Sequence, residues 1–124
     1  MSEHDTEVYI SLDFKKHRIR VYKQTLGYMG NPDYVYLLID PKEQRIGLFS
    51  SKVNAPDAHK VDLKKLGSDN SYELYSKCLF FNIHDLYPSI DERYSYRLTG
   101  RMIGRSLAVF QLRSMQRCEL IQVV

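Results

Sequence analysis

A strict alternation of side-chain character runs through residues 93–104, RYSYRLTGRMIG. Apolar or aromatic residues and one glycine occupy the even positions from Tyr94 to Met102, whereas polar or charged residues occupy the odd positions from Arg93 to Arg101. A period of two is typical of a β-strand, in which successive side chains point to opposite faces. The segment therefore predicts a strand with one face in a core and the other in solvent.

The same period recurs along the chain and predicts an antiparallel sheet. Residues 7–13, 17–23 and 107–114 alternate in this way, and residues 34–40 and 45–51 flank a four-residue loop. Asp40 and Pro41 suit the first two positions of a type I turn, so these last two segments predict a β-hairpin. A shorter strand is expected near residues 59–63.

One segment has the period of a helix instead. Tyr72, Tyr75, Leu79, Ile83 and Leu86 follow a helical stripe, and Pro88 suits its end. We predict an α+β fold, a twisted antiparallel sheet of five to seven strands with one main helix (about 71–87) packed on one face. With no repeat or linker, residues 1–124 are expected to form a single domain, and residues 1–6 a flexible tail.

The charge of the chain is distributed unevenly. Residues 1–92 carry 12 Lys and Arg against 14 Asp and Glu, whereas residues 93–124 carry six Arg and a single acid, Glu119. Guanidinium groups donate bidentate hydrogen bonds to phosphate, and tyrosine rings beside them offer stacking surfaces. The pattern therefore indicates nucleic-acid binding through a sheet face.

The candidate phosphate-binding residues are arginines expected on polar strand faces. They are Arg18, Arg20, Arg93, Arg97, Arg101 and Arg113. The alternative is that these arginines only solvate the strand faces on which they lie. The tyrosines at 22, 34, 36, 94 and 96 are likewise either stacking platforms or packing residues at the edge of the core.

No pattern in the chain indicates catalysis, a metal or a cofactor. The four histidines lack metal-ligand spacing, the six glycines form no phosphate-binding loop, and no acid–base pair stands at useful spacing. Cys78 and Cys118 are expected as reduced thiols. Because the N-terminus has no signal-peptide pattern and no apolar run approaches ~20 residues, we expect a cytoplasmic protein that does not enter a membrane.

Residues 18–49 resemble a known unit. Arg18, Arg20, Leu26, Gly27 and Ile46 occupy places comparable to those of the strand–helix–hairpin (βαββ) unit of AbrB-type transition-state regulators. This chain lacks the Gly-Arg pair that opens that strand and the proline that starts that helix. Small uncharacterised bacterial or phage-associated proteins with a PDYVYLLIDP-type hairpin are also similar. The resemblance implies a transcription-regulatory role, but the segment is stronger support for the sheet core than for a site.

Two functions remain open from the sequence. The first is a non-enzymatic protein that binds DNA or another nucleic acid through the arginine-rich sheet face. The alternative is a structural or protein-interaction module without a nucleic-acid role, which would use the same face against an acidic protein. In either case we expect a homodimer, because an uncovered tyrosine-rich sheet face gains from burial.

Overall fold

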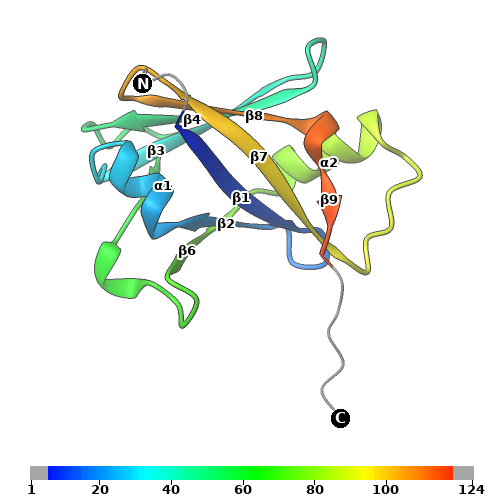
Figure 1. Cartoon of the computed structure of the whole chain (residues 1–124), viewed down its shortest axis with the longest axis horizontal. Coiled ribbons are helices and arrows are strands. Elements are labelled where there is room, and N and C mark those ends of the chain that lie inside the picture. Colours follow the sequence, from blue (N-terminus) through cyan, green and yellow to red (C-terminus); the bar gives the residue numbers. More distant parts are fainter. Residues whose placement is uncertain (1–5, 119–124) are drawn as a thin grey trace.

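Nine antiparallel strands form one strongly twisted, nearly closed sheet in the computed structural model, which describes residues 6–118 (Figure 1). The order across the sheet is β5-β3-β4-β8-β7-β1-β2-β6, and β9 pairs with β7 beyond the end of the β8 pairing. The strands are β1 (Glu7–Asp13), β2 (Arg18–Tyr22), β3 (Tyr34–Asp40), β4 (Arg45–Ser51), β5 (His59–Lys60), β6 (Ser71–Tyr75), β7 (Ser95–Ile103), β8 (Leu107–Gln111) and β9 (Gln116–Arg117).

The alternation in β7 separates an inner face from an outer face, as the sequence predicts. Tyr96, Leu98 and Met102 are buried on the inner face, whereas Arg97 and Arg101 are exposed on the outer face. The inner face of the neighbouring strands is equally apolar. Its fully buried side chains include Ile10, Leu12, Ile19, Ile46, Leu48 and Phe110. Burial of these side chains is the main force holding the sheet in its curved form.

Within residues 6–118, two α-helices accompany the sheet, so the prediction of one main helix is wrong. The first, α1 (Lys23–Tyr28), follows β2 directly and buries Thr25 and Leu26. The second, α2 (Lys77–Leu86), contributes Leu79, Phe80 and Ile83 to the core. The order β2, α1, β3, β4 is that of the expected strand–helix–hairpin segment.

The predicted helix at 71–87 is in fact a strand followed by a helix. Residues 71–75 pair with β2 as β6, and α2 begins only after Ser76, whose hydroxyl accepts a hydrogen bond from the Leu79 N–H at 3.2 Å. The helical stripe predicts the wrong structure for residues 71–75, because the sequence SYELY also alternates with a period of two. Leu74 on the inner face is buried, and Tyr75 on the outer face is 57% exposed.

The predicted number of strands is too low. β5 lies where the sequence predicts a short strand. The two further strands are β6, which the sequence predicts as part of the helix, and β9, whose two residues are too few to show alternation. Of the predicted tail, residues 1–5 lie outside the described residues, whereas the carbonyl of Thr6 accepts a hydrogen bond from the Met102 N–H at 3.2 Å. Among the described residues, no helix has both the length and the apolar character needed to cross a membrane.

Candidate nucleic-acid interface

The outer face of β7, β1 and β2 carries most of the candidate arginines. The sheet register places Arg97 of β7 beside Ser11 of β1, and Ser11 in turn beside Arg20 of β2. At about 4.8 Å per strand, the backbones of Arg97 and Arg20 are therefore roughly 10 Å apart. Arg97 and Arg101 are four residues apart on one strand, which corresponds to ~13 Å.

Arg18 is held by two carboxylates and is largely buried. Its Nη2 lies 2.8 Å from Asp13 Oδ2, its Nη1 lies 3.2 Å from Glu73 Oε2, and only 11% of its side chain is exposed. Burial would lower the pKa of Arg18, but the hydrogen bonds to Glu73 and Asp13 outweigh it and raise that pKa. Arg18 therefore links β1, β2 and β6 rather than offering a free cation.

Arg20 also has acidic neighbours. Its Nε lies 4.0 Å from Asp69 Oδ2, and the register sets it directly opposite Glu73 on β6. A hydrogen bond from the hydroxyl of Ser71 lowers the pKa of Asp69, so this carboxylate is charged at neutral pH. Much of the charge of Arg20 is therefore balanced within the protein.

Arg93 does not lie on the strand where the sequence placed it. β7 begins at Ser95, and Arg93 belongs to the preceding loop, where Asp91 binds both its backbone N–H and its guanidinium. The Arg93 Nη2 lies 2.8 Å from Asp91 Oδ2. This hydrogen bonding by Arg93 lowers the pKa of Asp91 to about 2. The local pair holds the loop in place and keeps Arg93 off the outer face of β7.

Three candidate arginines have no acidic partner among residues 6–118. No carboxylate oxygen of those residues lies within 4.0 Å of the guanidinium of Arg97, Arg101 or Arg113. The prediction that Arg113 lies on the return strand is wrong, because β8 ends at Gln111 and Arg113 lies in the following 3-10 turn, η3 (Leu112–Ser114). Because η3 contacts β7, the charge of Arg113 lies near the charges of the two β7 arginines.

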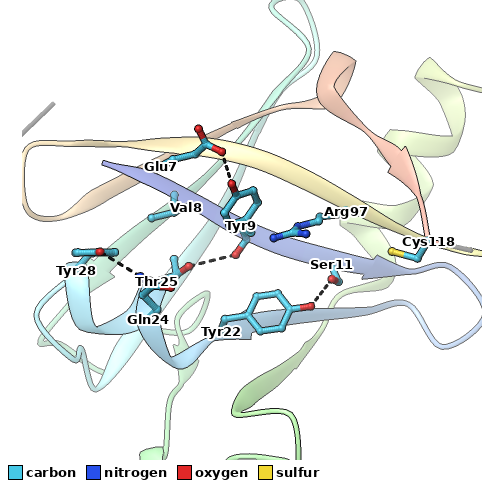
Figure 2. Close-up of a pocket in the computed structure, with 10 residues that line it drawn as sticks. All are labelled: Glu7, Val8, Tyr9, Ser11, Tyr22, Gln24, Thr25, Tyr28, Arg97 and Cys118. Atoms are coloured by element: carbon cyan, nitrogen blue, oxygen red, sulfur yellow. Dashed lines mark hydrogen bonds between the residues drawn. The ribbon is translucent and has the colours of Figure 1, made fainter. Parts of the chain in front are cut away.

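A tyrosine supports the guanidinium of Arg97. The carbon centre of that guanidinium lies 3.9 Å from the centroid of the Tyr9 ring, which is a cation–π distance. The hydroxyl at the tip of the Tyr9 ring donates a hydrogen bond to the Glu7 carboxylate, and this bond raises the pKa of Tyr9 (Figure 2). The guanidinium of Arg97 is thus oriented by an aromatic ring, while the N–H donors of this guanidinium form no hydrogen bond with a described residue.

A pocket of about 460 Å³ opens beside Arg97 (Figure 2). Its lining residues come from β1, the end of β2, α1 and β7, together with the residue that follows β9. It is lined by Glu7, Val8, Tyr9, Ser11, Tyr22, Gln24, Thr25, Tyr28, Arg97 and Cys118. Sequence reasoning missed this pocket because α1 and β1 are brought together only by the fold. The one local signal was the placement of Tyr9 and Ser11 on the polar side of the first strand.

The other tyrosines that the sequence singled out are dispersed. Tyr96 is buried, and its hydroxyl donates a hydrogen bond to the Asp91 carbonyl at 2.7 Å. Tyr34 and Tyr36 lie on β3, several strands from Arg97. Of that set, Tyr22 alone lines the pocket.

An apolar patch occupies the far half of the outer face. Leu38 of β3, Phe49 of β4 and Ile103 of β7 are 47%, 42% and 56% exposed. With Leu107 and Val109, Leu38 and Ile103 border a hollow of about 290 Å³. We call these five residues the outer apolar patch.

No group of three or more His, Cys, Asp or Glu side chains within residues 6–118 is arranged to hold a metal ion. Protein-family models, curated proteins and solved structures provide no match to this chain.

Proposed function

We propose that this chain is a non-enzymatic, cytoplasmic nucleic-acid-binding protein that contacts phosphates through the outer side of β7 and η3. One observation carries the proposal. Arg97, Arg101 and Arg113 have no carboxylate within ion-pairing distance among the described residues, whereas Arg18 has two and Arg20 and Arg93 have one each. Cations that face solvent without an internal counter-charge attract phosphate most strongly.

The phosphate contacts set the position of the nucleic acid rather than its sequence. Three guanidiniums give a salt dependence of log K on log[salt] of about −2 for a single strand and about −2.7 for a duplex. Raising the salt from 50 to 200 mM should therefore weaken binding about 20- to 40-fold.

Fluorescence anisotropy with labelled oligonucleotides tests this proposal. We expect Arg97→Glu combined with Arg101→Glu to abolish binding at 50 mM salt, because two attractive contacts become repulsive. Lys64→Glu combined with Lys65→Glu is the matched control, since these exposed lysines of the 3-10 turn η2 (Leu63–Lys65) carry the same charge on another segment. Absence of binding by the unaltered protein at 50 mM salt, or equal loss in both double variants, would refute the proposal.

A second candidate function, a homodimeric interaction module, is favoured by the outer apolar patch. A contiguous exposed apolar surface is typical of a protein contact. Its rim carries both charge signs, with Asp40 and Arg45 on one side and Arg101 on the other, as a self-complementary two-fold contact needs. Analytical ultracentrifugation at tens of micromolar should show a dimer that Phe49→Arg converts to a monomer. A monomeric unaltered protein would remove this candidate.

A further inference from the structure

The pocket beside Arg97 differs chemically from the phosphate contacts around it. Tyr9, Tyr22 and Tyr28 all line it, together with one cation and several groups that form hydrogen bonds. Tyr9 and Tyr22 lie on adjacent strands, and the register Ile10 to Val21 sets the two tyrosines opposite each other. We infer that this pocket binds one unstacked base of a single-stranded nucleic acid, an inference that rests on the proposed function.

The aromatic groups in the pocket provide stacking surfaces for a base. Bases stack on tyrosine rings and on the planar guanidinium of arginine, with little dependence on sequence. Tyr28 is 45% exposed on α1 and is therefore free to contact a ligand. The guanidinium of Arg97 already covers one side of the Tyr9 ring. A base can therefore stack on the outer surface of this guanidinium, while the edge of the guanidinium donates hydrogen bonds to phosphate.

The polar groups of the pocket suit the edge of a base. The Gln24 side-chain nitrogen bonds to the Tyr28 hydroxyl at 3.2 Å, which leaves the Gln24 carbonyl oxygen as an acceptor. The Glu7 carboxylate accepts from Tyr9 and keeps further acceptor capacity. The hydroxyls of Ser11 and Tyr22 are 2.6 Å apart and share one hydrogen bond, so the hydroxyl that accepts it keeps its own O–H donor. Acceptors at the rim favour the exocyclic amino groups of cytosine or adenine.

Single-stranded nucleic acid fits this arrangement better than a duplex. A paired base is stacked within its helix and must be extruded before it can enter a pocket. A duplex would therefore meet only the rim arginines, whereas a single strand can place phosphates on Arg97 and Arg101 and a base between α1 and β1. The pocket adds affinity only for the unpaired strand.

Four labelled probes test the inference by anisotropy at 50 mM salt. They are a 12-nucleotide DNA strand, the RNA strand of the same sequence, the DNA duplex, and a DNA strand of the same length that lacks its bases. We expect the intact strands to bind about tenfold more tightly than the duplex and the base-free strand, given the usual contribution of one stacked base. The tighter of the DNA and RNA strands identifies the kind of strand that the site selects.

A tyrosine variant with a matched control localises the effect. Tyr28→Ala removes an exposed ring from a helix and should weaken binding of the intact strand about tenfold, while the affinity for the base-free strand stays the same. Tyr75→Ala removes a ring that is 57% exposed, against 45% for Tyr28, from β6 outside the pocket, and should leave both affinities unchanged. Equal binding of all four probes, or no effect of Tyr28→Ala, would overturn the base pocket but leave the phosphate contacts standing. If none of the probes binds, the proposed function fails as well.

Discussion

Gly100 lies in the middle of β7, where a neighbouring strand approaches closely, and its replacement by alanine tests this packing. A Cβ atom at this position would lie 2.3 Å from the Val109 carbonyl oxygen and 2.5 Å from Cδ1 of Phe110. Real Cβ atoms essentially never come within 3.0 Å of a heavy atom outside their own residue and its two chain neighbours. Neither obstacle moves easily, because one is the backbone of β8 and the other is a ring that is completely buried.

Gly100→Ala should therefore destabilise the protein as an overpacked core does. Overpacking costs about 1–3 kcal/mol, and we expect about 3 kcal/mol here, since backbone and ring are both obstructed. For a chain of 124 residues, this free energy corresponds to a fall in Tm of about 10 °C. Thermal and urea unfolding followed by circular dichroism measure both quantities.

Gly27→Ala is the matched control for this substitution. Gly27 lies in α1, and a Cβ atom there would have no heavy atom within 4 Å. Alanine in a helix should raise the free energy of unfolding by about 0.5–1 kcal/mol relative to glycine. If the free energy of unfolding of Gly100→Ala lies within about 0.5 kcal/mol of that of the unaltered protein, β8 does not approach β7 this closely.

Three other side chains give predictions about stability and titration. Ser76→Ala removes the N-cap of α2 and should lower the free energy of unfolding by about 1 kcal/mol in urea. The pKa of the Asp91 carboxyl should be about 2 in an NMR titration and should return toward its ordinary value of 3.8 in Arg93→Ala. Because its pKa is lowered by folding, the Asp91–Arg93 pair stabilises fully above pH 3.8 and loses this effect as the pH falls through 2. Arg18→Met leaves two carboxylates without their cation and should cost about 2 kcal/mol at pH 7, measured by urea unfolding.

The sheet could be predicted from the sequence because alternation is a local property. The inner positions of β7 and the hairpin of β3 and β4 follow directly from it. The start of α2 could not be fixed in this way. Tyr72 and Tyr75 fit a helical stripe, whereas Tyr72 and Leu74 fit a strand period, and only the pairing with β2 decides between the two.

The candidate site was only partly predictable, because ion pairing depends on residues distant in sequence. Arg18 and Glu73 are 55 positions apart, and nothing local to either residue indicates their contact. The pocket likewise depends on α1 being positioned over β1, where Thr25 donates a hydrogen bond to the Tyr9 carbonyl at 3.2 Å. The short-range pair of Asp91 and Arg93 was within reach of sequence reasoning, since a carboxylate two positions away commonly caps a loop.

The distribution of ion pairs divides the outer face along β1. On the side of β2, an arginine must give up an internal carboxylate before it can bind a phosphate, so its net gain from binding is small. On the side of β7, Glu7 stands opposite Arg101 in the register but forms no ion pair with it, so a phosphate can bind there without breaking an ion pair, and counterion release drives binding. The six candidate arginines therefore reduce to three candidate contacts. Arg97 is the one that connects the phosphate contacts to the tyrosine pocket, because its guanidinium lies over Tyr9 and lines the pocket rim.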